Sequence, residues 1–203
     1  MRIIGDVHGR YAEYNKLASE AERSVCVGDV GFEYDGVTLD PLAHKIIGGN
    51  HDCYELVDDK FKQSPHFLGD FGMHYSDIDF FWARGGCSID RKWRSQGIDF
   101  WPDEELSMAS MHQCIDLYLA EKPSMVISHE CPSEICSFIS NADILRDYGF
   151  KPDWTSKTAQ MLQAMFESHR PNLWIFGHHH RSWLKQLGGC TFLCLPILGH
   201  VDI

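Results

Sequence analysis

The chain has 203 residues, 44% of them hydrophobic and 23% charged, which suits one globular domain over residues 1–203 and is too short for two of ordinary size. Its formal net charge of −11 argues against binding along a nucleic acid backbone, because such binding needs a basic surface. No apolar run approaches the ~20 residues of a membrane span, and the first residues lack the pattern of an export signal. We therefore expect a cytoplasmic protein with no membrane contact.

Short apolar runs alternate with helical patterns along the chain, which predicts an α/β layered domain. The expected strands are 2–4, 24–27, 45–47, 78–84, 125–128, 173–176 and 191–195, and the expected helices are 11–22, 103–121 and 155–169. In the second helix, apolar side chains at helical spacing predict a stripe facing the core: Leu106, Ala109, Cys114, Leu117 and Tyr118. The segment 85–102 is the longest stretch without a clear element, and such loops often line active sites.

Cysteine and histidine are both frequent in this chain. The eight cysteines show no C-x-x-C spacing, and we expect them to be reduced thiols in a chain without an export signal. Structural roles are expected for the histidines that lie away from strand ends, namely His44, His66, His74, His112, His169 and His200.

Polar side chains follow five of the predicted strands. They are Asp6 and His8, Asp29, Asn50 with His51 and Asp52, His129 with Glu130, and the run His178, His179 and His180. Each of these alone would be an ordinary turn residue, but turn chemistry does not account for five such clusters in one chain. Because the carboxyl ends of strands converge on one crevice, we expect these residues to meet. Imidazole together with carboxylate and amide oxygen predicts divalent Mn, Fe, Zn or Ni ions.

The five clusters resemble the calcineurin-like metallophosphoesterases, whose signature blocks GDxHG, GDxx, GNHD/E, xH and GHxH all match in order between Asp6 and His180. The resemblance implies a four-layer α/β/β/α sandwich, in which two mixed sheets are flanked by helices. It also implies two divalent metal ions with named ligands. Asp6, His8 and His180 would bind one ion, Asn50, His129 and His178 the other, Asp29 would bridge both, and His51 would be the catalytic histidine.

Physical chemistry supports these implied roles. Two cations ~3.5–4 Å apart would lower the pKa of a bridging water and stabilise an in-line displacement at phosphorus. His51 is then free to act as general acid for the leaving oxygen or to bind phosphoryl oxygens. Alternation along the loop should point His179 away from the metals. Asp52 and Glu130 are expected either to orient imidazoles or to face solvent and cap backbone.

The second block departs from the protein phosphatase branch of the resembled family, which reads GDxVDRG. Phe32 and Glu33 replace the Asp that supports the catalytic histidine and the Arg that binds phosphate, and the third block ends in Asp52. These departures favour a phosphodiesterase or nucleotidase, so substrate contacts must come from elsewhere. The best candidates are Arg84, Arg91 and Arg94, in a segment that also carries Trp93; the alternative is a solvated basic loop with a buried Trp. That segment, with residues 131–134, is similar to small phage and bacterial members.

The sequence therefore predicts hydrolysis of a phosphodiester, in a small nucleotide such as a cyclic nucleotide, by a metal-bridging hydroxide with His51 as general acid. Manganese is the ion favoured in vitro, and the expected partner is a small phosphate ester, either a nucleotide or an RNA end. Three alternatives stay open: a phosphomonoesterase, a 3′-5′ nuclease, which the acidic charge disfavours, and a scaffold that keeps the metal site for binding.

Overall fold

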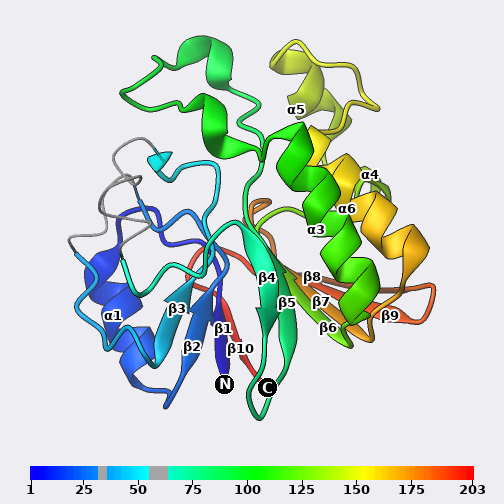
Figure 1. Cartoon of the computed structure of the whole chain (residues 1–203). Helices are drawn as coiled ribbons and strands as arrows, with labels where there is room; N and C mark the ends of the chain where they lie inside the picture. Colours follow the sequence, from blue (N-terminus) through cyan, green and yellow to red (C-terminus); the bar gives the residue numbers. More distant parts are fainter. Residues whose placement is uncertain (32–35, 55–63) are drawn as a thin grey trace.

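The computed structural model describes residues 1–31, 36–54 and 64–203 (Figure 1). The described strands form two mixed sheets. The first sheet has the order β10 (His200–Asp202), β1 (Arg2–Ile4), β2 (Ser24–Cys26) and β3 (His44–Ile46). The second has the order β4 (Phe71–His74), β5 (Phe80–Ala83), β6 (Met125–Ser128), β7 (Leu173–Phe176), β9 (Cys190–Cys194) and β8 (Trp183–Leu187).

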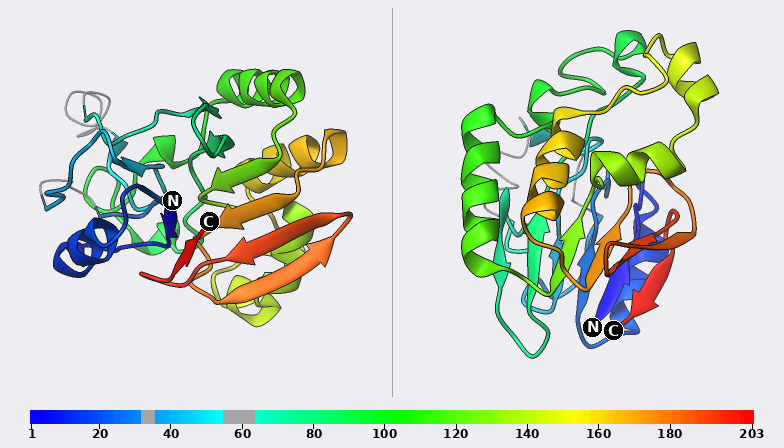
Figure 2. Two further views of the ribbon diagram at one scale, coloured as in Figure 1. Left: turned by 90° about the horizontal axis from the view of Figure 1, so that it is seen from below. Right: turned by 90° about the vertical axis from the view of Figure 1, so that its right-hand side faces the viewer.

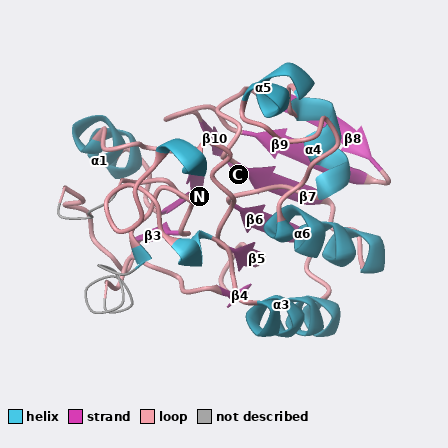
Figure 3. Ribbon diagram, turned by 90° about the horizontal axis from the view of Figure 1, so that it is seen from above, coloured by secondary structure: helices cyan, strands magenta, loops and turns pink. Residues whose placement is uncertain are grey.

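Helices lie on the outer side of each sheet. Helix α1 (Tyr11–Ser19) flanks the first sheet, while α3 (Met108–Glu121), α4 (Ser133–Ile139) and α6 (Lys157–Ser168) flank the second (Figures 1 and 3). Helix α5 (Ala142–Asp147) stands beyond the strand ends, as do the 3-10 turns η1 (Arg91–Trp93) and η2 (Pro102–Glu104) (Figure 2). Among the described helices, none has both the length and the apolar character needed to cross a membrane.

Three apolar clusters fill the three interfaces between these layers. Alternate side chains of one strand enter different clusters: Ile4 packs with Tyr14 of α1, whereas Ile3 packs between the sheets with Ile127 and Ile175. On the far face of the second sheet, residues such as Trp174 pack against α3, α4 and α6. Alternation of this kind is what a sheet covered on both faces requires. The predicted four-layer α/β/β/α sandwich is therefore confirmed.

Parallel pairing brings the predicted functional residues to one end of the molecule. Strands β1, β2 and β3 pair in parallel, as do β5, β6, β7 and β9. The carboxyl ends of β1, β2, β3, β6 and β7 consequently point the same way, toward the top of Figure 1. The chain termini lie together at the opposite end, where β10 pairs with β1 and the Met1 amino group donates to the Ile203 carbonyl at 2.8 Å (Figure 2).

The element predictions were correct in the core and incomplete elsewhere. All seven predicted strands are present within three residues at either end, but β4, β8, β10, α4 and α5 were not predicted. The helix expected over 103–121 begins only at Met108, because the Ser107 side chain accepts from the Ser110 amide and caps it. Its predicted stripe is wrong at Ala109, which is exposed, and Met111 is buried instead.

Candidate metal centre

Two groups of metal-binding side chains lie side by side at the strand ends. In the first group, donor atoms of Asp6, His8, Asp29 and His180 all lie within 4.8 Å of one another. His180 Nε2 is 3.1 Å from Asp6 Oδ2 and 2.9 Å from His8 Nε2, while His8 Nε2 is 3.7 Å from Asp29 Oδ2. Two carboxylates and two imidazoles at this spacing form a donor set for a divalent transition metal.

The second group consists of Asp29, His129 and His178, with Asn50 between the two rings. Asn50 Oδ1 lies 2.9 Å from His129 Nε2 and 2.8 Å from His178 Nδ1. His129 Nε2 is also 3.4 Å from Asp29 Oδ1. The structure thus brings together all seven residues that the sequence suggested as ligands, and Asp29 is the member that both groups share.

Asp29 is completely buried, and its environment fits a pair of cations. Its Oδ1 accepts from the His51 amide at 2.8 Å, whereas its Oδ2 has no hydrogen-bond partner among the described residues. Burial, together with the charges of Asp6 and Asp52, raises its pKa well above the usual range. A buried carboxylate beside two others needs positive charge for its ionised form to be stable. The donor set and the orphaned oxygen therefore fit divalent ions.

The loops that carry these residues adopt unusual backbone conformations. His8, Asp29, His178 and His180 all have positive φ, between 49° and 63°, which costs energy for residues other than glycine. Glycine is required beside them: a Cβ at Gly49 would lie 2.1 Å from Asp29 Oδ1 and therefore clash with it. Strain of this kind, concentrated at one end of the sheets, is typical of a functional site.

Asp52 fixes two of these loops to each other. Its buried carboxylate accepts from the amides of Gly49 at 2.6 Å, Asp29 at 3.1 Å and Val30 at 3.1 Å. Of the two roles expected for Asp52, the structure shows the backbone-capping one. Because the amides belong to the loops after β2 and β3, Asp52 holds Asp29 and Asn50 in register.

Glu130 and His179 lie on the outer side of the second group. Glu130 Oε2 is 3.2 Å from His178 Nε2, and Glu130 Oε1 is 2.9 Å from His179 Nε2. His179 thus turns away from both donor groups, as alternation along the loop predicted. The buried Glu130 carboxylate has its pKa held below the usual range by these two imidazoles, despite the opposing effect of burial.

A cavity of about 360 Å³ opens beside the two groups. Asp29, Asn50, His51 and the three histidines of the last loop line one side of it. The other side is lined by residues of the segments 87–94 and 139–156, which stand above the strand ends in Figure 1. The volume lies within the range of pockets that bind small molecules.

His51 and Arg94 meet at the wall of this cavity. The terminal nitrogens of Arg94 lie 2.9 and 3.1 Å from the two ring nitrogens of His51. Burial, followed by the charge of Arg94, lowers the pKa of His51 to about 3. Asp90 holds the guanidinium in place, because its carboxylate pairs with Arg94 Nε at 2.7 Å. Neither of the two donor groups found among the described residues includes His51.

The other two predicted substrate residues are placed differently. Arg84 is buried, pairs with Asp70 at 2.5 Å, donates to the Asp103 carbonyl at 2.8 Å and lies over the Tyr54 ring. Arg91 is exposed on η1. Neither arginine is among the described residues that line the cavity. Trp93, expected to be buried or to stack on a base, is 60% exposed and packs on Tyr148. Phe32 and Glu33 lie outside the described residues.

Sequence reasoning missed two residues that support the second group. Asn50 Nδ2 donates to Ser88 Oγ at 2.9 Å, and the Ser88 amide donates to Glu104 Oε1 at 3.0 Å. Burial raises the pKa of Glu104 to about 7. The one sequence signal for Ser88 was its place in the glycine-rich segment after β5. Glu104 lay within a stretch predicted to be helical, which concealed it.

The chain is similar to known proteins in family, in sequence and in structure. A model of the calcineurin-like phosphoesterase family matches residues 2–182. A lariat debranching enzyme of Entamoeba histolytica is 22% identical over 98% of this chain and 68% of its own length. A Staphylococcus aureus protein described as a proposed 5′-nucleotidase superposes with a TM-score of 0.55 at 11% identity, covering 98% of this chain and 48% of that one. Phosphopantetheinyl hydrolase of Mycobacterium tuberculosis superposes with a TM-score of 0.52 at 14% identity, covering 97% of this chain and 89% of that one.

The chain spans about half the length of the first of these structures, and the low identities to both show a shared fold alone. The family match is decisive because it covers most of the chain and all five strand-end clusters. Phosphoester hydrolysis with bound divalent metal ions follows from it, in agreement with the donor groups described above. The chain therefore belongs to the calcineurin-like phosphoesterase family.

Proposed function

We propose that this protein hydrolyses a phosphodiester bond in a small nucleotide, such as a cyclic nucleotide. The observation that carries the proposal is the pair of donor groups sharing Asp29 at the wall of a cavity that also presents His51 and Arg94. Residues 1–203 act as one functional domain. Its substrate partner is a small phosphate ester, either a nucleotide or an RNA end.

Each donor group would hold one divalent ion. Asp6, His8 and His180 would hold the first ion, Asn50, His129 and His178 would hold the second, and Asp29 would be shared by both. The distances given above support this division. When bound, the two ions supply a water-derived nucleophile at neutral pH and neutralise charge on the phosphoryl group. Manganese, iron, zinc and nickel all suit this set of nitrogen and oxygen donors, with manganese favoured in vitro.

His51 and Arg94 act on the substrate from the cavity wall. Burial and the charge of Arg94 lower the pKa of His51, so its ring is neutral in the free protein and its one N–H can donate to a phosphoryl oxygen. An anionic phosphate beside the ring would raise the pKa of His51, and the imidazolium would then protonate the leaving oxygen as general acid. Arg94 is the one predicted substrate arginine that lines the cavity, and its guanidinium is placed to pair with the same phosphate.

The far side of the cavity supports a substrate with a base. Tyr148 and Trp154 line it together with the aliphatic side chains of Ile139 and Leu145. Aromatic rings next to a phosphate site can stack with a base. The Entamoeba relative is named as an enzyme, a lariat debranching enzyme, which supports an enzymatic function over a scaffold.

The experiment that tests the proposal compares a phosphodiester with a phosphomonoester. Bis-p-nitrophenyl phosphate and p-nitrophenyl phosphate are each incubated with the purified protein, with and without Mn²⁺. We expect hydrolysis that requires Mn²⁺, favours the diester and is lost in His51→Ala. Preference for the monoester would replace the proposal with a phosphomonoesterase. Inactivity with Mn²⁺, Fe²⁺, Zn²⁺ and Ni²⁺ would replace it with the scaffold function.

A further inference from the structure

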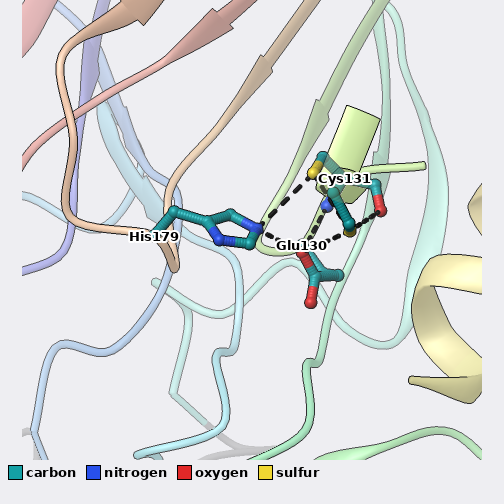
Figure 4. A group of neighbouring side chains, drawn as sticks. Glu130, Cys131 and His179 are labelled. Carbon is teal, nitrogen blue, oxygen red and sulfur yellow. Dashed lines mark hydrogen bonds and ion pairs between the residues drawn. The ribbon is translucent and has the colours of Figure 1, made fainter. Parts of the chain in front are cut away.

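A third cluster of metal-binding side chains lies outside the two donor groups. It consists of Glu130 and Cys131 after β6, Cys136 in α4, and His179 after β7. Figure 4 shows His179 turned toward Glu130 and Cys131. The donor atoms of all four residues lie within 4.8 Å of one another, although His179 is distant from the other three in sequence.

The distances within this cluster match a tetrahedral zinc site. His179 Nε2 is 2.9 Å from Glu130 Oε1 and 3.5 Å from Cys131 Sγ. Cys136 Sγ is 3.5 Å from Cys131 Sγ and 3.7 Å from Glu130 Oε1. Zinc bonds of about 2.0–2.3 Å in a tetrahedron place the donor atoms about 3.3–3.8 Å apart. Three of the four measured edges fall in that range, and the fourth, between His179 and Glu130, is a hydrogen bond that a bound ion would replace.

The chemistry of the four side chains is also that of a zinc site. Two sulfurs, an imidazole and a carboxylate select a borderline-soft ion such as Zn²⁺ over Mg²⁺ or Ca²⁺. Both cysteines and Glu130 are buried. The thiols would release their protons on binding, and a divalent cation among them would compensate the negative charge of the resulting thiolates and of Glu130. Glu130, Cys136 and His179 line the cavity, which gives a cation a route to the cluster.

We propose that Glu130, Cys131, Cys136 and His179 bind a zinc ion, separate from the two ions of the donor groups that share Asp29. The site is closed, because four protein side chains fill a tetrahedron, so its role is structural. It ties the start of α4 to the loop after β7. Glu130 also links the zinc site to the second donor group. Its Oε2 contacts His178 Nε2 at 3.2 Å, while its Oε1 faces the cluster. Zinc on Oε1 would hold the carboxylate that orients the His178 ring.

Cobalt substitution tests this site without relying on activity. The purified full-length protein is stripped of metal, loaded with Co²⁺ and examined for a thiolate-to-cobalt charge-transfer band, alongside metal content per chain. The donor groups that share Asp29 contain only nitrogen and oxygen, so they cannot produce that band. We expect the band in the wild type and in Asp29→Asn. We expect a weaker band in Cys131→Ser and in Cys136→Ser, because each variant keeps one thiolate, and loss of the band with about one ion fewer per chain in the double variant.

Cys114→Ser is the matched control, because Cys114 is equally buried but contacts Met165 in the apolar core. That variant should keep the band. A wild-type protein without the band would overturn the proposal, as would a band that persists in the Cys131→Ser/Cys136→Ser double variant. If the variants fail to fold, the wild-type spectrum decides alone. A disulfide between Cys131 and Cys136 in the protein purified under reducing conditions would also overturn it.

Discussion

The two sides of the cavity are built from different kinds of backbone. We call the residues on the strand-end loops (Asp29, Asn50, His51 and His178) the floor, and the segments 87–94 and 139–156 the roof. The floor residues lie on the loops that follow β2, β3 and β7, and Asp52 accepts from amides of the first two of these loops. The roof consists of a 3-10 turn, the end of α4, the short helix α5 and loops, with Trp93 60% exposed.

This contrast separates chemistry from substrate selection. The floor is constrained because Asp29 and Asn50 are buried and strands fix the positions of its loops, and it includes Asp29, the residue that both donor groups share. The roof has few buried side chains to constrain it and supplies the aromatic and basic groups around the rest of the cavity. Changes in the floor should therefore abolish turnover, whereas changes in the roof should alter the substrate affinity.

Asp29→Asn should have the largest effect. Asn offers one oxygen in place of two and no charge, so it could no longer bridge both ions. We expect kcat/KM to fall by about 10⁴-fold, since each ion contributes several kcal/mol of transition-state stabilisation. Metal content per chain and kcat/KM would be measured together. Asp116→Asn, an exposed substitution on α3, should leave both unchanged. Full activity in Asp29→Asn would contradict the shared-ligand geometry.

His51→Ala should lower kcat by about 10³-fold, because a positioned proton donor typically contributes between 10² and 10⁴. Bound metal should stay at the wild-type level, since the described donor groups do not include His51. Steady-state kinetics and metal analysis separate these two effects. His112→Ala, on the exposed face of α3, serves as the control. Loss of metal in His51→Ala would show that the residue is a ligand.

Glu104→Gln tests the link between floor and roof, in which Asn50 donates to Ser88 and the Ser88 amide donates to Glu104. The measured quantity is the pH dependence of the unfolding free energy. Burial raises the pKa of Glu104 from 4.5 to about 7, so the folded state binds the proton more tightly than the unfolded state. Protonation therefore stabilises the fold fully below about pH 4.5, and this contribution is lost as the pH rises to about 7. Relative to wild type, Glu104→Gln should gain on the order of 3 kcal/mol of unfolding free energy across that interval.

Urea unfolding of wild type and Glu104→Gln at a series of pH values between 5 and 8 measures this difference. Glu134→Gln, an exposed carboxylate in α4, provides the control and should show a constant difference from wild type. A constant difference for Glu104→Gln as well would mean that Glu104 ionises normally in the folded chain.

Arg94→Ala should have the smallest of these effects and should act mainly on KM. Loss of one charged hydrogen bond to phosphate costs about 1.5–3 kcal/mol, which is roughly a 10- to 150-fold decrease in kcat/KM. Arg91→Ala, three residues earlier and outside the cavity lining, should be close to wild type. Equal losses in the two variants would indicate that the roof contributes general positive charge and that Arg94 makes no specific contact.

The sequence predicted the floor because its residues follow strands buried on both faces, and such strands appear as short apolar runs. The strands that sequence analysis missed carry weaker signals. The edge strand β8 has no fully buried residue, and its sequence, Trp-Leu-Lys-Gln-Leu, shows no alternation of apolar and polar residues. Strand β10 has only three residues, one of them apolar. Helices α4 and α5 are too short for a helical pattern to stand out.

Two features depend on tertiary contacts that the sequence does not reveal. Arg84 and Arg94 looked equivalent in sequence, but Asp70 and Tyr54 hold Arg84 away from the cavity lining while Asp90 holds Arg94 at it. The proposed zinc site was missed because Cys131 and Cys136 are five residues apart and therefore lack the C-x-x-C spacing of common zinc motifs. Their histidine partner comes from a loop more than 40 residues later. Motif spacing alone cannot detect such a site.

Anomalous diffraction from crystals of the protein soaked in Mn²⁺ would locate the ions that Asp29 is proposed to share. We expect two manganese peaks about 3.5–4 Å apart, one on each side of the Asp29 carboxylate. The first should lie among Asp6, His8 and His180, and the second among Asn50, His129 and His178. A single peak, or two peaks that do not share Asp29, would contradict the proposal.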